Sequence, residues 1–124
     1  MKLAGISFGW VKATEGQTFD DGSYERHRKE ARRAGIPLGA YHFARPGDAA
    51  AQAAHFVKVV KTQNGFRAGD VAIIDVENTK KQPHLWDGTT PTALRAFIDR
   101  FVKDVRQDLP VQMPGGRVGA ELSL

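Results

Sequence analysis

Two carboxylic acids, Asp75 and Glu77, stand one residue apart at the end of a short apolar stretch, residues 71–74. Side chains alternate between the faces of a strand, so both carboxyls are expected on one face, with Cα atoms about 6.5–7 Å apart. Mutual repulsion and partial burial favour protonation of one carboxyl, which could donate a proton near neutral pH while its neighbour stays an anion. Cleavage of a glycosidic bond needs this pairing of an acid with an anion.

The same pair of carboxyls also permits a structural interpretation. Asp75 could begin a loop, and Glu77 could cap an element or meet an arginine, since structural carboxylates also perturb one another. The apolar stretch lies between Gly69-Asp70 and Asn78-Thr79, which is typical of a strand buried on both faces in a parallel α/β sheet. Independent motifs must decide between the two interpretations.

The rest of the chain is predicted to alternate between strands and helices. Strands are expected at residues 3–13, 36–43 and 71–77, and helices at 24–34, 49–61 and from Pro91 onward. Gly35 is a natural helix stop, and Thr90 can cap the helix that Pro91 begins. Three strand–helix repeats predict parallel strands joined by right-handed crossovers. Residues 109–124 show no periodicity, and we expect an irregular tail there.

Composition limits the classes of function. A length of 124 residues with 41% hydrophobic content predicts one globular domain. The chain has no cysteine, which excludes disulfides and thiolate metal sites. Its histidines lack ligand spacing, so no metal site is expected; they are His27, His42, His55 and His84.

A formal net charge of +4 favours anionic partners such as nucleic acid or an anionic cell wall. The basic cluster at residues 26–29 with Arg32 and Arg33 is predicted to be the solvated face of a helix. We expect no nucleic-acid partner, because stacking aromatics do not alternate with this charge. The N-terminus has no stretch long enough for a signal peptide, and nothing approaches membrane-spanning length. Synthesis in the cytoplasm without membrane insertion is therefore expected.

Three motifs follow one another at the predicted strand ends. They are Trp-Val-Lys-Ala-Thr-Glu-Gly at 10–16, Gly-Ala-Tyr-His-Phe-Ala-Arg-Pro at 39–46 and Asp-Val-Glu at 75–77. Together they resemble glycoside hydrolase family 25, the muramidases of bacteria, fungi and phages. Lesser marks of that family occur at residues 19–20, 34–37 and 52–56. The resemblance covers about residues 5–78 well and the following helix loosely.

The resemblance implies an α/β fold, a partial (β/α) TIM-like barrel. It implies hydrolysis of the β-1,4 bond between N-acetylmuramic acid and N-acetylglucosamine in peptidoglycan, without a metal or organic cofactor. By the same resemblance, Glu77 is the general acid, and Asp75 assists the substrate's N-acetyl group as its oxygen attacks the anomeric carbon. Glu15 would be a further acidic residue of the cleft.

The resemblance also implies that Phe19, Tyr41 and Phe43 line the sugar-binding groove. Aromatic rings suit the apolar C–H faces of sugars, although Tyr41 and Phe43 could equally be core residues. His42 falls on the opposite phase of its strand. We expect it to be a hydrogen-bonded packing residue between strand and helix rather than a catalytic one.

The chain departs from the family at both ends. The family's opening strand, with its Gly-x-Asp-x-Ser segment, has no counterpart before residue 3, and residues 110–124 match none of its later strands. We therefore expect residues 1–108 to form about half of a catalytic barrel. Closure of such a barrel typically takes ~200–250 residues. Half a barrel would stay open, so side chains on its inner face, such as Ile73, should be exposed to water.

Two expectations follow from an open barrel. An oligomer or a complementing chain could cover the open side. The alternative to an active enzyme is a catalytically incompetent remnant, or a module that binds peptidoglycan without cleaving it.

Overall fold

The structure, a computed structural model, describes residues 9–66, 70–109 and 117–123. Its centre is a five-stranded sheet with the order β2-β1-β3-β4-β5. The strands are β1 (Gly9–Glu15), β2 (Phe19–Asp20), β3 (Leu38–Phe43), β4 (Val71–Glu77) and β5 (Arg117–Ser123). Short β2 is antiparallel to β1, whereas β1, β3, β4 and β5 are parallel. The predicted parallel α/β fold is confirmed; residues 3–8 of its first predicted strand lie outside the described residues.

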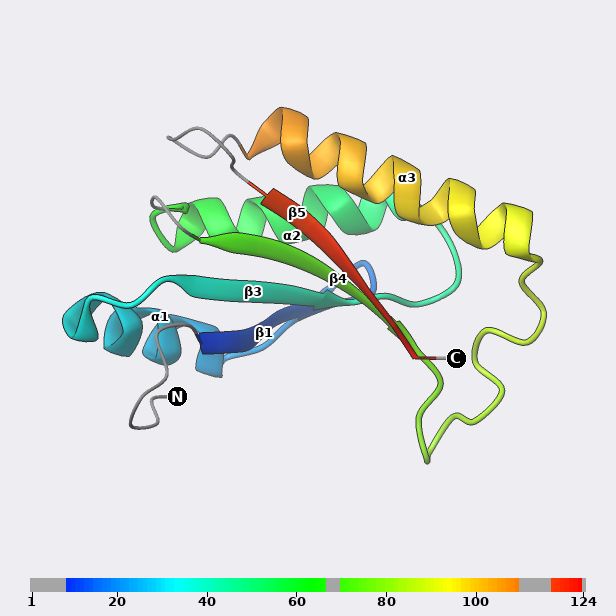
Figure 1. The fold of residues 1–124 in the computed structure, drawn as a ribbon, viewed down its shortest axis with the longest axis horizontal. Coiled ribbons are helices and arrows are strands. Elements are labelled where there is room, and N and C mark those ends of the chain that lie inside the picture. The colour runs from blue at the N-terminus through cyan, green and yellow to red at the C-terminus, as the bar shows by residue number, and fades with distance from the viewer. Residues whose placement is uncertain (1–8, 67–69, 110–116, 124) are drawn as a thin grey trace.

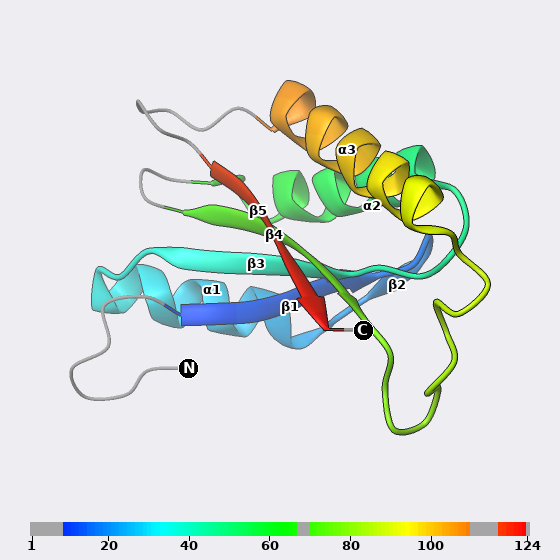
Figure 2. The ribbon, with the colours of Figure 1, turned by 45° about the vertical axis from the view of Figure 1, so that its right-hand side comes forward.

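Three helices pack against one face of this sheet (Figures 1 and 2). They are α1 (Ser23–Ala34), α2 (Ala49–Thr62) and α3 (Pro91–Asp108). In both views α2 and α3 lie side by side, and α1 lies behind β3 and β1. The predicted helices are confirmed, with ends that differ by a residue or so.

Local signals fix the helix ends. The Asp48 side chain accepts a hydrogen bond from the Ala51 amide at 3.0 Å, which caps α2. Thr90 caps α3 in the same way, by accepting from the Ala93 amide at 3.1 Å. Gly35 ends α1 with a φ of 70°, a left-handed conformation that side chains with a Cβ rarely adopt.

The helices bury one apolar cluster against the sheet. Ile74 and Val76 of β4 point into this cluster and are completely buried. From α2 and α3 come Phe56 and Phe101, whose ring centroids are 5.8 Å apart. Because side chains alternate along a strand, the residues beside Ile74 and Val76 face away from the helices. The opposite face of the sheet is therefore where polar side chains of β4 can gather.

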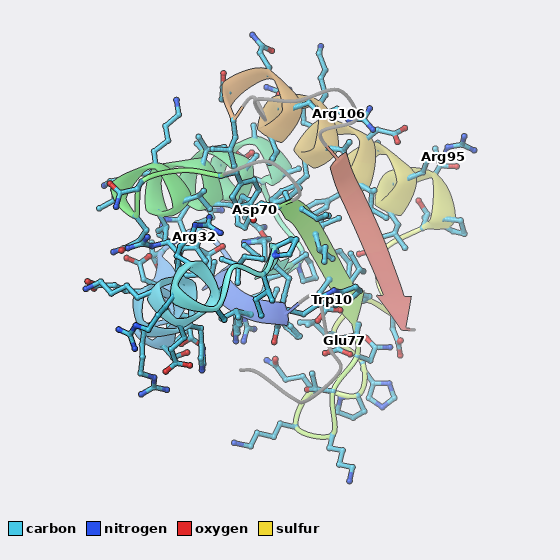
Figure 3. All side chains as sticks on the ribbon, turned by 60° about the vertical axis from the view of Figure 1, so that its left-hand side comes forward. Trp10, Arg32, Asp70, Glu77, Arg95 and Arg106 are labelled. Carbon is cyan, nitrogen blue, oxygen red and sulfur yellow. The ribbon has the colours of Figure 1, made fainter. Side chains whose placement is uncertain are left out.

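A buried ion pair ties the beginning of β4 to α1. The Arg32 guanidinium donates to both carboxylate oxygens of Asp70, at 2.5 and 3.2 Å. Asp70 also accepts from the Leu38 amide at 2.9 Å. Figure 3 shows Asp70 near the start of β4 with Arg32 reaching it from α1. A carboxylate without solvent is tolerated here because three donors surround it.

The basic cluster of α1 is less exposed than the sequence suggested. Arg32 is engaged by Asp70, and Arg28 is only 8% exposed. Both side chains lie on the helix face turned toward the sheet. The prediction of a solvated basic face was wrong for these two residues, which leaves less positive charge available to an anionic polymer.

The predicted irregular tail was wrong for residues 117–123. This segment forms β5 and pairs with β4 along its whole length, from Arg117 opposite Val71 to Ser123 opposite Glu77. Its apolar residues alternate with other types, as in a strand, but its partner β4 is distant in the sequence. Residues 110–116 and 124 lie outside the described part of the chain. The sheet thus continues beyond the boundary expected at residue 108.

The expected exposure of Ile73 was also wrong, because the residue is only 5% exposed. In the strand register Ile73 lies between Tyr41 of β3 and Gly119 of β5. A position between two paired strands shields it, even on the face without helices.

Among the described helices, none combines the length and apolar character needed to cross a bilayer.

Candidate active site

The carboxyl ends of β1, β3 and β4 bring together residues that are far apart in the sequence. Glu15 lies opposite Phe43 in the strand register, and Phe43 lies opposite Asp75. Tyr41, two residues before Phe43, shares their face. In parallel α/β barrels, catalytic side chains gather at this end of the strands. The three strand-end motifs predicted to converge therefore do so in the fold.

Asp75 and Glu77 both belong to β4 and point away from the helices. Both side chains are half-buried, whereas Val76 between them is completely buried. Figure 3 shows Glu77 at the end of β4 opposite to Asp70. The backbone oxygen of Asp75 accepts from the Ala44 amide at 2.9 Å, which extends the pairing with the end of β3. Asp75 does not begin a loop, so that part of the structural interpretation was wrong.

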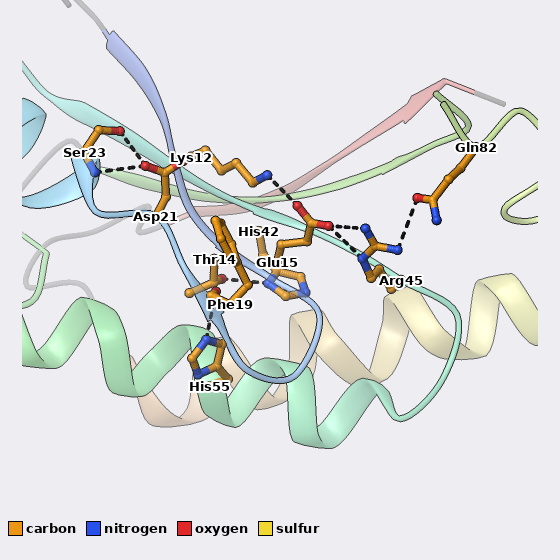
Figure 4. Close-up of polar contacts among 10 residues, drawn as sticks. All are labelled: Lys12, Thr14, Glu15, Phe19, Asp21, Ser23, His42, Arg45, His55 and Gln82. Atoms are coloured by element: carbon orange, nitrogen blue, oxygen red, sulfur yellow. Dashed lines mark hydrogen bonds and ion pairs between the residues drawn. The ribbon is translucent and has the colours of Figure 1, made fainter. Parts of the chain in front are cut away.

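Glu15 is held between two cations (Figure 4). The Lys12 ammonium donates to Oε1 at 2.6 Å, and Nε of Arg45 donates to Oε2 at 2.7 Å. Burial on its own raises the pKa of Glu15, but the hydrogen bonds and charges of Lys12 and Arg45 outweigh it. The net result is a pKa below the ordinary value. Glu15 is thus an anion near neutral pH and is unsuited to donate a proton.

Lys12 also contacts two of the predicted sugar-binding rings. Its ammonium lies 5.2 Å from the ring centroids of both Phe19 and Phe43, a distance at which a cation is attracted to a ring face. Phe19 is 51% exposed, whereas Phe43 is only 8% exposed. Phe19 can therefore offer its ring to a ligand. Phe43 is almost inaccessible to a ligand, and its ring contacts the Lys12 ammonium instead.

The Tyr41 hydroxyl lies in the negative field of the site. Burial raises the pKa of this phenol, and the charges of Asp75, Asp21, Glu77 and Glu15 raise it further. The phenol therefore stays protonated and remains a hydrogen-bond donor. In the strand register Tyr41 lies between β1 and β4, the two strands that carry Glu15, Asp75 and Glu77. Tyr41 is only half-buried, which distinguishes it from a core residue.

The family model described as "Glycosyl hydrolases family 25" matches residues 1–111, a range that includes all six predicted site residues. The chain belongs to glycosyl hydrolase family 25.

Two kinds of relative support the assignment. The family 25 chain is 33% identical over 103 residues to "Lysozyme M1" of Streptomyces globisporus, covering 82% of this chain and 35% of that protein. Its fold is similar to the crystal structure of the bacterial lysozyme from Streptomyces coelicolor, with a TM-score of 0.72, 31% identity, and coverage of 85% of this chain and 49% of that one.

A second solved structure is also similar to this chain. The muramidase from Trichobolus zukalii superposes with a TM-score of 0.71 and 32% identity, covering 84% of this chain and 50% of that one. The chain thus spans about a third of the curated lysozyme and half of the solved structures. A partial (β/α) barrel, as predicted, is the architecture that these comparisons support.

His42 is a packing residue in this family 25 chain, as predicted. Its ring nitrogens contact Thr14 Oγ1 at 2.7 Å and Gln52 Oε1 at 2.8 Å. The ring also stacks on Phe101, with centroids 5.0 Å apart. Burial lowers the pKa of His42 to about 4, so the imidazole is neutral near pH 7. It faces the helices and not the carboxylates.

The sequence interpretation missed Lys12 and Arg45 as site residues. Both lie inside motifs that were noticed, at 10–16 and 39–46, but their roles depend on contacts across strands. Arg45 reaches Glu15 from 30 residues away, and its Nη1 donates to Gln82 Oε1 at 3.2 Å. The available signal was one basic residue in each of these two strand-end motifs.

The short hairpin that carries Phe19 is fastened to α2. His55 Nε2 lies 2.7 Å from Asp20 Oδ1 and 3.0 Å from the Phe19 backbone oxygen. Because a carboxylate oxygen and a backbone carbonyl oxygen only accept hydrogen bonds, Nε2 must carry the hydrogen. His55 therefore fixes the backbone of β2 and, through it, the direction of the Phe19 ring.

No group of three or more metal-ligating side chains occurs within the described ranges 9–66, 70–109 and 117–123. The acidic groups of the site are instead Glu15, Asp75 and Glu77, of which Glu15 is paired with the cations Lys12 and Arg45. A site of this composition can transfer protons, stabilise positive charge and bind a neutral polar ligand against an aromatic ring.

Proposed function

We propose that this chain carries the proton-transfer part of a muramidase active site. Its substrate would be the β-1,4 bond between N-acetylmuramic acid and N-acetylglucosamine in peptidoglycan. The observation that carries the proposal is the alignment of Glu15 with Asp75 across three parallel strands, with Glu77 on the same face. Family membership supports the reaction class. Residues up to 108, together with β5, would form part of the catalytic domain.

In the proposed reaction Glu77 gives its proton to the glycosidic oxygen as the bond to the anomeric carbon breaks. The oxygen of the substrate's own N-acetyl group forms the new bond to that carbon, and Asp75 orients this group. Water then adds to the anomeric carbon, the N-acetyl oxygen is released, and a proton returns to Glu77. No metal or organic cofactor takes part in these steps.

Glu15 has a different role in this proposal. Its two cationic partners keep it ionised, so it acts through its charge and by fixing Lys12 and Arg45. Because Lys12 and Arg45 already balance its charge, Glu15 is not placed to stabilise a cationic sugar ring. Glu15 is thereby assigned to positioning these two cations rather than to proton transfer.

The aromatic side chains would hold the glycan. Phe19 offers an exposed ring face, and the protonated Tyr41 hydroxyl offers a donor to sugar oxygens. Phe43 is nearly buried, so its contribution would come through Lys12 and through the shape of the surface. The protein would act on the cell wall, whose glycan strands are its proposed partner.

The test uses the purified chain and a peptidoglycan suspension. Loss of turbidity together with release of reducing ends is expected, and Glu77→Gln should lower the rate by about 100-fold or more, the typical contribution of a general acid. Glu25→Gln, an exposed glutamate on α1, is the matched control and should leave the rate unchanged. Equal rates for both variants would refute the assignment of Glu77.

A second candidate is binding of peptidoglycan without cleavage, which the exposed Phe19 ring beside Lys12 favours. Cosedimentation with cell walls and no release of reducing ends would select it. A second chain that covers the open side remains a prediction. Sedimentation equilibrium of the purified protein would test it, since a monomer with full activity would exclude it.

A further inference from the structure

The Gln52 side chain lies beneath the site, on α2, and is almost completely buried. Its Oε1 accepts from the Arg45 amide at 3.2 Å, and its Nε2 donates to the Arg45 carbonyl oxygen at 2.8 Å. One side chain thus binds both backbone polar groups of one residue. Backbone groups cannot exchange donor and acceptor, so these contacts fix which end of the Gln52 amide is oxygen.

This orientation determines the state of His42. Because Oε1 of Gln52 only accepts, Nε2 of His42 must donate to it across 2.8 Å. In the neutral ring Nδ1 then carries no hydrogen and accepts from the Thr14 hydroxyl at 2.7 Å. Thr14, His42, Gln52 and the Arg45 backbone therefore form one chain of hydrogen bonds that runs from β1 through β3 to α2.

The chain of contacts continues into the site through the Arg45 side chain. Arg45 lies two residues beyond the end of β3, where no strand pairing fixes its backbone. Its guanidinium holds Glu15 on one side and Gln82 on the other. Its Cδ also lies 3.4 Å from where a Cβ on Gly16 would stand, and Gly16 has a φ of 59°. A displacement of the Arg45 backbone would therefore move the guanidinium relative to Glu15.

We propose that Gln52 is a positioning residue that keeps the Arg45 guanidinium on Glu15 by clamping the backbone of Arg45. Gln52 itself touches none of the site carboxylates. The role deepens the proposed muramidase function and rests on it only for its consequence in catalysis. A residue that merely filled the core would affect stability alone, whereas this role also predicts a change in the titration of Glu15.

The test follows the Glu15 carboxyl by carbon NMR as the pH is varied. Gln52→Met keeps the length and shape of the side chain but removes its hydrogen bonds. We expect the midpoint of Glu15 to rise by roughly half a unit or more, because a nearby opposite charge lowers a carboxyl pKa by about 1–3 units. Arg45→Met removes the guanidinium itself, so its shift of the Glu15 midpoint is the largest that loss of the Arg45 contact can cause. Gln107→Met, at an exposed position of α3, should give none.

A folded Gln52→Met variant with an unchanged Glu15 midpoint would overturn the proposal. If that variant does not fold, hydrogen exchange of the Arg45 amide in the unaltered protein decides. Protection similar to that of the β3 amides supports the clamp, and exchange at the rate of a free loop refutes it. Neither readout depends on hydrolysis. A protein that shows the Glu15 shift but cleaves no peptidoglycan would therefore refute the muramidase proposal and leave the clamp intact.

Discussion

The Lys12 ammonium lies 2.6 Å from Oε1 of Glu15, although the two residues are three apart on the same strand. In a regular strand, residues three apart point to opposite faces. The pairing of β1 with β3 shifts between Lys12 and Thr14, which leaves Ala13 as an extra residue. Such a β-bulge reverses the alternation beyond it. The bulge thus puts a cation and a carboxylate on the same face of the site.

Replacing Lys12 by methionine should raise the pKa of Glu15 toward its ordinary value. A lowered pKa means that ionised Glu15 stabilises the fold above its unfolded-state pKa, and that this stabilisation disappears as the pH falls through the folded-state pKa. The free energy of unfolding of the variant at pH 7 should therefore be lower than that of the unaltered protein. Between pH 7 and pH 3 it should then fall by less than in the unaltered protein. Urea unfolding at pH 7 and pH 3 measures this, with Lys103→Met on α3 as the control.

His42 should make the fold sensitive to mild acid. Its pKa is about 4 in the folded protein and about 6.5 when unfolded, so the unfolded chain binds the extra proton between these values. The free energy of unfolding should fall by about 2 kcal/mol from pH 7 to pH 5 on this account. The dependence should flatten below about pH 4, where His42 is protonated in both states.

The matched variant for this prediction is His42→Gln, which cannot titrate. Its free energy of unfolding at pH 7 will be lower, since packing against Phe101 is lost. The informative quantity is the difference between pH 7 and pH 5, which should be smaller than in the unaltered protein. All other residues are the same in both proteins, so an equal difference in both would contradict the neutral state of His42.

Asp70→Asn should destabilise the fold by roughly 3 kcal/mol, because removal of one partner leaves the buried Arg32 guanidinium without its counterion. The loss is expected near the lower end of the usual range, since Arg32 retains 13% side-chain exposure and can reach water. Asp99→Asn, at an exposed position of α3, should change the free energy of unfolding by less than about 0.5 kcal/mol. Chemical denaturation of the two variants provides the comparison.

The sequence predicted those features that depend on neighbouring residues. Gly35 and Thr90 act within a single helix turn, and alternation along β4 placed Asp75 and Glu77 on one face. Features that depend on distant partners were not readable. The bulge at Ala13 appears only in the pairing with β3, and β5 needs β4 to become a strand.

The same reasoning explains the error at Ile73. Burial was judged from the size of an open barrel, whereas two adjoining strands already cover a residue in the middle of a sheet. The sequence predicted that carboxylates and aromatic rings gather at the strand ends, but it did not predict the cations that lie beside them. Lys12 and Arg45 acquire their roles only when the ends of three strands come together.

The exposed Phe19 ring gives a final prediction that separates ligand binding from stability. Phe19→Ala should weaken binding to peptidoglycan fragments by about threefold to tenfold, or roughly 0.7–1.4 kcal/mol, because a ring face available to sugars is lost. Stability should change little, since the ring is 51% exposed. Trp10→Ala removes a ring that is 49% exposed at the other end of β1 and serves as the control. Titration calorimetry with soluble fragments distinguishes the two. Equal affinities for the Phe19 and Trp10 variants would contradict a binding role for Phe19 beside Lys12 and the carboxylates.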